Sequence, residues 1–185
     1  MPPTSSTMLL RLFLSAFCGL LLMTAQAGAE PPKTPEPPNR LRVGGGTNLP
    51  IPRFVSLGSS VINLRRGPGK DYPVDWVLKK RGMPVEIVAE YEQWRRIRIM
   101  DGSEGWVHQN LLSGKRTALV ATPEIALLDK ANVNSAEIAR LRQGVLLTLD
   151  DCLNPQFCKV EVGGHKGFIA RTGLYGLYAS ERFED

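Results

Sequence analysis

Histidine and cysteine are scarce in this chain, which has two histidines and three cysteines among 185 residues. No His-x-x-x-His or Glu-x-x-His spacing surrounds His108 or His165. Because such spacings place metal ligands side by side on one element, their absence argues against a zinc site. We therefore expect the protein to bind no metal and no other cofactor.

Residue groups that would support catalysis are also missing. Cysteine catalysis would need a free, activated thiol beside a histidine. Asp150 and Asp151 are adjacent, but neighbouring side chains on a strand point to opposite faces and cannot cooperate as acid and base. The stretch "RRGPGKD" (65–71) lacks the spacing of a phosphate-binding loop, and its Gly-Pro-Gly is typical of a turn. We expect that the chain is not an enzyme.

The apolar stretch from Leu12 to Met23 is shorter than the roughly 20 residues that cross a bilayer as a helix. Arg11 precedes this stretch, and two overlapping Ala-x-Ala cleavage sites follow it, formed by Ala25, Ala27 and Ala29. This order is typical of a secretory signal peptide, which we place at residues 1–29. It predicts export to the periplasm and no stable membrane insertion after cleavage. An uncleaved membrane anchor is the alternative.

Residues 30–53 contain seven prolines and the glycine triplet Gly44–Gly46. A segment of this composition buries too little apolar surface to fold, so it predicts a disordered linker. A phosphate-binding role for the glycines is unsupported, because no Gly-Lys-Ser or Gly-Lys-Thr follows them. We expect folded structure from Phe54 onward.

The chain is basic, with 23 lysines and arginines against 18 acidic residues and a pI near 9.3. A basic pI is one feature that is typical of nucleic-acid-binding proteins. Loss of Arg11 with the signal peptide would lower the net charge from +5 to +4, which suits a protein that meets anionic envelope polymers. We expect no nucleic-acid partner, since export separates the protein from nucleic acid.

The rest of the chain contains an internal repeat. Residues 75–88 align with 136–149, and residues 94–107 align with 157–169 with one residue of slip. The aligned pairs are Gly82 with Gly144, Trp94 with Phe157, Ile97 with Val160, Gly105 with Gly167 and Trp106 with Phe168. The repeat predicts two copies of one fold, at residues 54–115 and 116–185.

Each copy contains short runs rich in valine, isoleucine and leucine, such as "PVEIVAE" (84–90) and "VLLTLD" (145–150), separated by glycine turns. This pattern predicts an all-β chain that forms two small barrels. Residues 134–144 could instead form a helix that is capped at Asn134 or Ser135 and ended by Gly144. We expect a strand there, because the aligned segment contains Pro73 and bulky β-forming residues.

The first copy carries a recognisable order of residues. Asn63, Arg65, Gly67 and Pro68 form Asn-x-Arg-x-Gly-Pro, Gly82 precedes a Val-x-Ile strand, Trp94 opens the next strand, and Gly-Trp-Val occupies 105–107. This order resembles the bacterial SH3-like (SH3b) domain. The second copy is similar more loosely, since it lacks the first element and has phenylalanine for both late tryptophans. Its ending, "CLNPQFCKVEVGGHKGFIARTGLYGLY", resembles the second module of a two-module exported family of Gram-negative bacteria. The resemblance implies two SH3-like β-barrels in tandem.

Candidate binding residues lie in the first copy, which contains all three tryptophans. Strand alternation places Trp94, Arg96 and Arg98 on one face, opposite the core-forming isoleucines. A tryptophan beside guanidinium groups can hold a peptide or sugar that carries a carboxylate. The alternative is that the arginine stems cover Trp94 as ordinary barrel surface. Tyr72 and Trp76, in the predicted recognition loop, complete the ligand-binding set.

Four further residues of the first copy are predicted to be structural rather than ligand-binding. Gly67 and Pro68 belong to a turn. Gly105 and Trp106 lie where an aromatic residue closes a barrel end.

In the second copy, Cys152 and Cys158 form a close pair, and export would place them in an oxidising compartment. We therefore predict a disulfide that braces the loop before the strand "KVEV" (159–162).

The resemblance implies a non-catalytic periplasmic binding module that recognises cell-wall peptidoglycan peptide or a cell-envelope protein through the first copy. The alternative is an adaptor or regulatory subunit whose tandem barrels form a protein–protein platform. A binding module predicts an open aromatic groove at Tyr72, Trp76 and Trp94. An adaptor predicts packed rings and an apolar patch elsewhere, for example at "LYGLY" (174–178).

Overall fold

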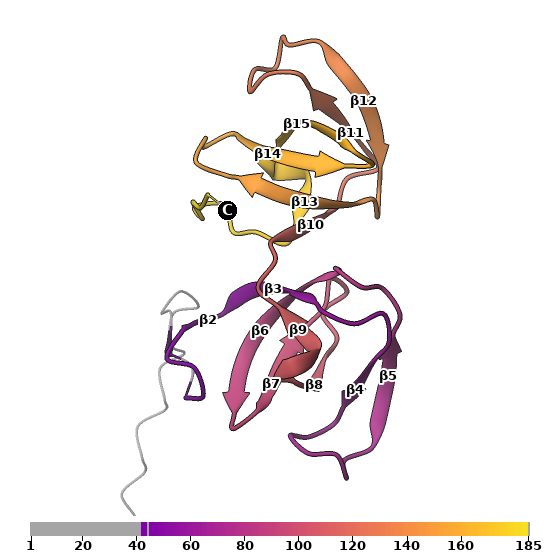
Figure 1. Ribbon diagram of the computed structural model, residues 1–185, viewed down its shortest axis with the longest axis vertical. Coiled ribbons are helices and arrows are strands. Elements are labelled where there is room, and N and C mark those ends of the chain that lie inside the picture. Colours follow the sequence, from indigo (N-terminus) through magenta and orange to yellow (C-terminus); the bar gives the residue numbers. More distant parts are fainter. Residues whose placement is uncertain (1–41, 44, 185) are drawn as a thin grey trace, which may run out of the picture. The chain divides into compact units, whose positions relative to one another are not determined.

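The computed structural model describes residues 42–43 and 45–184 (Figure 1). The predicted signal peptide and most of the predicted linker lie outside these residues. Regular structure in the described part consists of β-strands and two 3-10 turns, η1 (Gln109–Leu111) and η2 (Arg171–Gly173). The predicted all-β fold class is therefore confirmed. No helix in this part is long and apolar enough to span a membrane.

The first barrel is a seven-stranded antiparallel sheet with the strand order β5-β4-β8-β7-β6-β3-β9. Its strands are β3 (Arg53–Leu57), β4 (Ile62–Arg65), β5 (Val74–Leu78), β6 (Pro84–Tyr91), β7 (Trp94–Arg98), β8 (Glu104–His108) and β9 (Leu112–Ser113). Alternate residues of these strands point inward and form one apolar core. The buried residues of that core are Leu57, Ile62, Leu64, Val85, Ile87, Ile97 and Val107.

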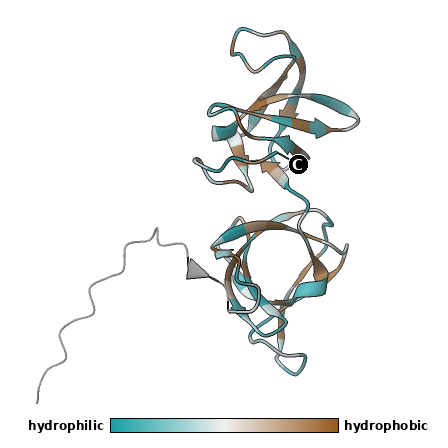
Figure 2. Cartoon of the chain, turned by 60° about the vertical axis from the view of Figure 1, so that its left-hand side comes forward, coloured by the Kyte–Doolittle hydropathy of each residue, from teal (hydrophilic) through white to brown (hydrophobic). Residues whose placement is uncertain are grey.

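The second barrel repeats this strand order, with β12-β11-β15-β14-β13-β10-β16 as its sheet. Its strands are β10 (Thr117–Val120), β11 (Glu124–Leu128), β12 (Glu137–Arg142), β13 (Leu146–Asp151), β14 (Phe157–Val162), β15 (His165–Ala170) and β16 (Leu174–Tyr175). A separate core fills it, built mainly from leucine, valine and the two half-cystines. Figure 2 shows hydrophobic and hydrophilic stretches alternating around both sets of strands.

The segment that could have formed a helix contains strand β12. It pairs with β11 over five residues, with Leu141 opposite Ile125 and Ala139 opposite Leu127. The strand prediction for this segment is confirmed. Cross-strand apolar pairs replace the helix that local sequence signals would allow.

The end of the predicted linker is more ordered than its composition suggests. Strands β1 (Arg42–Val43) and β2 (Pro50–Ile51) pair with one another, and β3 begins at Arg53. Thr47 donates hydrogen bonds to Glu90 on β6. Structure therefore begins before the predicted boundary at Phe54, because polar contacts to the barrel order a segment that has no core of its own.

The apolar run after the first barrel contains strand β10. Thr117 on this strand donates its hydroxyl to the carbonyl of Gly82, at 2.7 Å. The Phe54 ring packs against Tyr175 and Tyr178, with ring centroids 5.4 Å and 4.9 Å away. Burial raises the pKa of Tyr175 to about 12, so its hydroxyl is neutral at physiological pH. The "LYGLY" stretch is thus used for internal packing.

The disulfide between Cys152 and Cys158 is present and both half-cystines are buried, so this prediction is confirmed. The loop that it closes is held by Arg171, whose guanidinium is also buried. Arg171 donates hydrogen bonds to the carbonyls of Cys152 and Asn154, and to those of Tyr178 and Glu181 in the C-terminal tail. Arg171 therefore links the disulfide loop to the C-terminal tail through hydrogen bonds to both.

Loss of the disulfide is expected to destabilise the second barrel. For a ring of this size, the loss of loop-closure entropy predicts a free energy of unfolding lower by about 2 kcal/mol in the Cys152→Ala, Cys158→Ala double variant. Urea denaturation of this variant and of the reduced parent should give the same loss. An unchanged midpoint in both samples would contradict a stabilising role.

Candidate functional site

Strand β7 divides its side chains between the core and the surface, as the alternation of residues predicted. Ile97 and Arg95 point inward and are 0% and 2% exposed. Trp94 is partly buried, and Arg96 and Arg98 are exposed on the opposite face. Trp94 lies opposite His108 on β8, and the two rings meet edge to face with centroids 5.6 Å apart. This pair forms one wall of a pocket on the outer face of the sheet.

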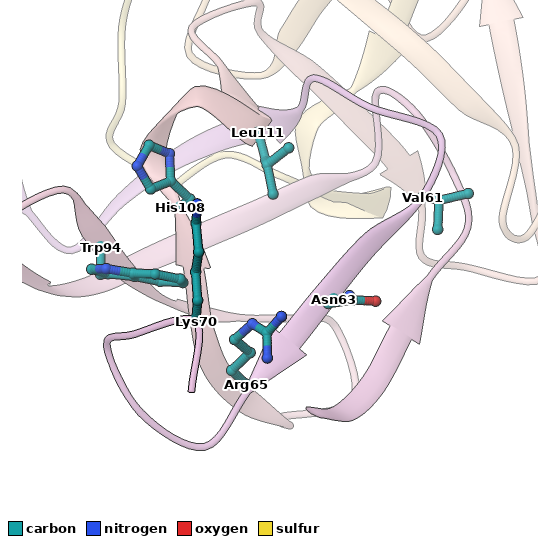
Figure 3. A pocket seen from close by; sticks show the side chains of 7 residues that line it. All are labelled: Val61, Asn63, Arg65, Lys70, Trp94, His108 and Leu111. Atoms are coloured by element: carbon teal, nitrogen blue, oxygen red, sulfur yellow. The ribbon is translucent and has the colours of Figure 1, made fainter. Parts of the chain in front are cut away.

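The pocket has a volume of about 290 Å³ (Figure 3). It combines apolar side chains and the Trp94 ring with an amide and two cations from adjoining strands and loops. The lining residues are Val61, Asn63, Arg65, Lys70, Trp94, His108 and Leu111. A partly apolar concavity with a few polar groups is the usual form of a binding site.

His108 is held in one tautomer by its neighbours. The backbone N–H of Asn110 donates to His108 Nδ1 at 3.3 Å, so Nε2 carries the proton and donates to Gln93 Oε1 at 2.9 Å. Both ring nitrogens are thus occupied. His108 contributes an orientated wall to the pocket rather than a free base.

Two glycines allow the strands and loops around the pocket to approach closely. A Cβ atom on Gly105 would lie 2.5 Å from Leu64 Cγ, so β8 could not pass so near β4 with a larger residue. A Cβ atom on Gly67 would lie 2.3 Å from the Tyr72 ring. Pro68 sits partly buried in the same turn. Arg65 Nη1 donates to the carbonyl of Tyr72 at 2.8 Å and closes this loop against β4.

Arg96 and Arg98, predicted to attract a ligand carboxylate, do not line the pocket. Arg96 pairs with Glu104 at 2.8 Å, and Arg98 pairs with Glu104 at 2.7 Å and Glu86 at 3.1 Å. The hydrogen bond to Glu104 raises the pKa of Arg98. The positive charges of Arg96 and Arg98 are therefore neutralised by carboxylates of the same barrel surface. Sequence reasoning missed the acidic partners because they lie on other strands.

The cations of the pocket are instead Arg65 and Lys70. Arg65 has five N–H donors and uses one of them on the Tyr72 carbonyl. Lys70 is exposed, in the loop between β4 and β5. Asn63 and Arg65 belong to the Asn-x-Arg-x-Gly-Pro element, so that motif was a signal for the pocket. On sequence alone the motif indicates only the fold.

Tyr72 and Trp76 do not join Trp94 in one groove. Trp76 belongs to strand β5, where it pairs with Leu64, whose side chain points into the core. Tyr72 packs over Gly67 in the loop before that strand. Trp106 is partly buried on β8, between Arg65 on β4 and Arg96 on β7. The sequence suggested one aromatic groove because it placed Trp76 in a loop instead of a strand.

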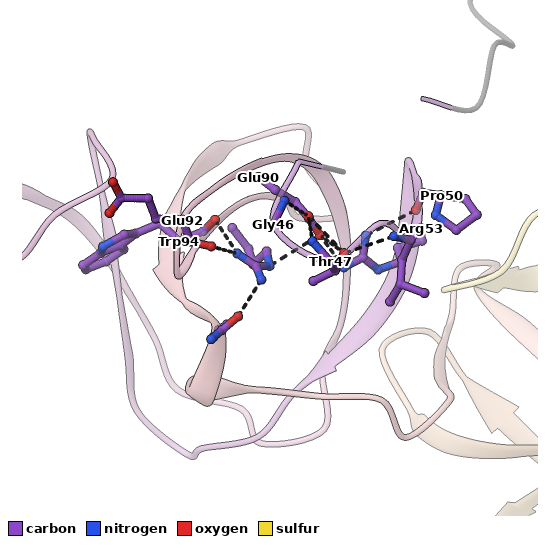
Figure 4. Close-up of polar contacts among 10 residues, drawn as sticks. Gly46, Thr47, Pro50, Arg53, Glu90, Glu92 and Trp94 are labelled. Atoms are coloured by element: carbon purple, nitrogen blue, oxygen red, sulfur yellow. Dashed lines mark hydrogen bonds and ion pairs between the residues drawn. The ribbon is translucent and has the colours of Figure 1, made fainter. Parts of the chain in front are cut away.

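A buried carboxylate supports the turn that presents Trp94 (Figure 4). The Glu90 side chain has no exposed surface and accepts hydrogen bonds from Gly46 N, Thr47 N and Thr47 Oγ1 at 2.8–3.0 Å. Arg53 Nη2 lies 2.6 Å from it and Arg95 Nε 3.4 Å. Arg95 in turn donates to the carbonyls of Glu92 and Trp94 and to Gln109 Oε1. We call these residues the Glu90 cluster.

The second barrel has no comparable aromatic platform at the matching position. Phe157, which corresponds to Trp94, is only 4% exposed. Trp94 and Phe157 therefore differ in exposure as well as in residue type: Trp94 lines a pocket, whereas Phe157 is buried without belonging to the core cluster of the second barrel. Among the described residues, no cluster of histidine, cysteine and acidic side chains is arranged to hold a metal ion.

Comparison with known proteins identifies part of the chain. Residues 58–114, which lie within the first barrel, match the family model described as the bacterial SH3 domain. No curated protein matches the chain.

Two solved structures from Trichomonas vaginalis are similar to the chain. NlpC2 has 15% identity and a TM-score of 0.31, over 67% of this chain and 48% of that one. NlpC1 has 14% identity and a TM-score of 0.32, over 71% of this chain and 48% of that one. The chain thus spans about half the length of each.

Stability is expected to depend on the charge of Glu90. Burial opposes that charge, but the bonds from Arg53, Thr47 and Gly46 outweigh it and lower the pKa of Glu90 below its ordinary value of 4.5. A lowered folded-state pKa gives stability that is present above pH 4.5 and is lost as the pH falls through the folded value. Glu90→Gln should therefore lower the free energy of unfolding at neutral pH by about 3 kcal/mol.

The measurement is denaturant unfolding at pH 7 and at about pH 3, where the carboxyl groups are largely protonated. The difference between parent and Glu90→Gln should shrink at the lower pH. Glu92→Gln, which changes an exposed carboxylate two residues away, is the matched control. A Glu90→Gln effect that is equally large at both values would show that shape, rather than charge, explains the loss.

Proposed function

We propose that this chain is a non-catalytic binding module of the bacterial envelope, exported to the periplasm, whose first barrel binds a carboxylate-bearing peptide of peptidoglycan in the Trp94 pocket. The observation that carries the proposal is the combination of a partly open tryptophan with two cations in one concavity of a bacterial SH3 domain. Bacterial SH3 domains often bind peptidoglycan, which supports this ligand class. A peptide segment of an envelope protein is the second candidate ligand.

The pocket residues divide into apolar and polar groups. The Trp94 face, Val61 and Leu111 offer apolar surface to the aliphatic part of a peptide. Arg65 and Lys70 provide N–H donors that suit a carboxylate, and the Asn63 amide can both donate and accept. His108, the remaining polar residue of the lining, is hydrogen-bonded at both ring nitrogens. The apolar and cationic groups together support binding of a peptide that carries a carboxylate.

An adaptor role for the C-terminal tail is less well supported. That role predicted an exposed apolar patch at residues 174–178. Tyr175 and Tyr178 instead pack on Phe54, and Tyr178 donates its hydroxyl to Glu86 at 2.7 Å. Leu174 is buried.

Trp94→Ala is expected to weaken binding of purified peptidoglycan sacculi or soluble stem peptides by about 2 kcal/mol, because it removes the aromatic wall of the pocket. Lys70→Ala should weaken binding less and make it less sensitive to salt. Calorimetry with soluble fragments and a sacculus pull-down give the two readouts.

The matched control is Trp76→Ala, which removes another exposed tryptophan outside the pocket. The sequence-based hypothesis expected that change to weaken binding too, whereas the pocket geometry predicts unchanged affinity. Circular dichroism and unfolding midpoints show whether each variant is folded. A folded Trp94→Ala variant that binds as tightly as the parent would exclude the pocket.

Export rests on the order of charged, apolar and small residues between Arg11 and Ala29. Protein recovered from the periplasmic fraction of a Gram-negative host is expected to begin near Gly28 or Glu30. N-terminal sequencing checks this. An intact N-terminus in the membrane fraction would support the uncleaved anchor instead.

A further inference from the structure

Strand β5 ends the sheet of the first barrel, and its outer edge is unpaired within the described part of the chain. It pairs with β4 on one side, and no second partner strand is found among residues 42–43 and 45–184. Alternate N–H and C=O groups of such a strand point away from the sheet and are available to another strand. Its side chains are unusually apolar for an open edge, since Val74, Trp76 and Val77 are 41%, 60% and 47% exposed.

The equivalent edge of the second barrel is built differently. Strand β12 has the sequence EIARLR, and three charged residues, Glu137, Arg140 and Arg142, are exposed along it together with one apolar residue, Ile138. Charged residues on an edge strand discourage other strands from pairing with it. Strand β5 has the sequence VDWVL, and its one charge, Asp75, is paired with Arg66 at 2.6 Å. The same position in the repeat is therefore protected in one barrel and open in the other.

The exposed ring of Trp76 is the surface that an added strand would cover. It lies opposite Leu64, which is fully buried, so its ring is on the core side of the sheet. The ring is nevertheless mostly exposed, because β5 is the last strand of its sheet. A strand added at this edge would place a residue directly opposite Trp76 and bury the ring.

Positive charge brackets the edge. Residues 65–81 contain six basic and two acidic residues, a net charge of +4, whereas the whole of residues 54–115 carries +3. Exposed cations lie on both sides of β5 in the sequence, namely Arg66 and Lys70 before it and Lys79, Lys80 and Arg81 after it. Antiparallel pairing with a second copy of β5 would bring these cations together. The charge thus favours an acidic occupant over self-association.

We propose that β5 is a docking edge for an extended, acidic segment of a partner protein, which adds to the sheet as a further strand and covers Trp76. Backbone hydrogen bonds would supply much of the affinity, and the cations at the two ends would select the charge. The Trp76 surface is distinct from the Trp94 pocket, because the two tryptophans lie on opposite faces of the sheet and three strand spacings, about 14 Å, separate β5 from β7. The two surfaces are neighbours, since Asn63 and Arg65 of the pocket lie on β4 beside β5 and Lys70 flanks both.

The test uses the purified full chain and a blocked nine-residue peptide with two glutamates at each end and alternating valine and threonine between them. We expect the outward-facing amides of residues 74–78 to exchange with deuterium about tenfold more slowly in its presence. Tryptophan fluorescence should shift to shorter wavelength in the parent and in Trp94→Ala, but not in Trp76→Ala. The affinity should fall about fivefold in Trp76→Ala, the effect of losing one cross-strand aromatic contact.

Two altered peptides separate the contribution of backbone hydrogen bonds from that of charge. N-methylation of the alternate residues that face β5 removes the backbone donors and should abolish protection of its amides. Replacement of the glutamates by lysines should abolish binding at low salt. Lys79→Glu in the protein should weaken binding of the acidic peptide, and circular dichroism checks that each variant folds.

Three results would overturn the proposal: no binding of the acidic peptide, equal binding of the N-methylated peptide, or protection of the Trp94 pocket in place of β5. Protection of β5 without peptide that increases with protein concentration would identify a second copy as the occupant and equally refute an acidic partner. Failure here leaves the peptidoglycan test unaffected, since that test depends on Trp94 and is insensitive to Trp76.

Discussion

The buried carboxylate of Glu90 is the constraint on which the first barrel and its pocket depend. It lies on β6 without exposed surface, and its cost of burial is offset by bonds from Gly46, Thr47 and Arg53 and by the nearby Arg95. Arg95 is itself buried and holds the backbone carbonyls on either side of the β6–β7 turn. Buried ionic groups, Glu90 and Arg95, therefore hold the turn that orients Trp94, whereas apolar packing holds the rest of the barrel.

In the second barrel, a disulfide and an arginine stabilise the position that corresponds to the Glu90 cluster. The repeat aligns Arg95 with Cys158 and Gln109 with Arg171. The first barrel has an arginine on the strand and its hydrogen-bond acceptor on the 3-10 turn. At the same two positions the second barrel has a half-cystine on the strand and an arginine on the turn. Arg171 then donates to backbone carbonyls only, and the disulfide supplies the cross-link that the Glu90 cluster provides in the first barrel. Phe157 is buried at the start of this strand, so the second barrel presents no aromatic surface that matches Trp94.

Short-range sequence signals predicted the strands, the alternation of β7 and the disulfide, because each depends on residues that are close in the chain. The pairing of Arg98 with Glu86 depends on the register between β6 and β7, and the bond from Thr47 to Glu90 joins a segment outside the strands to β6. For that reason the two arginines looked available for a ligand and the glycine-rich segment looked unattached. Trp76 was assigned to a loop because Pro73 and the preceding glycines dominate the local pattern. Its cross-strand contact with Leu64 is what places it in a strand.

The two barrels differ in the distribution of charge. Arg96 and Arg98 are neutralised by Glu104 and Glu86, so residues 82–115 add no net positive charge to the first barrel. The excess lies in residues 65–81, which provide Arg65 and Lys70 to the pocket and flank β5. An anionic partner that approaches this barrel is therefore drawn to one segment, and both exposed aromatic surfaces are reached from it. The second barrel carries a net charge of −1 over residues 116–185, and its edge strand β12 carries three exposed charged residues, Glu137, Arg140 and Arg142.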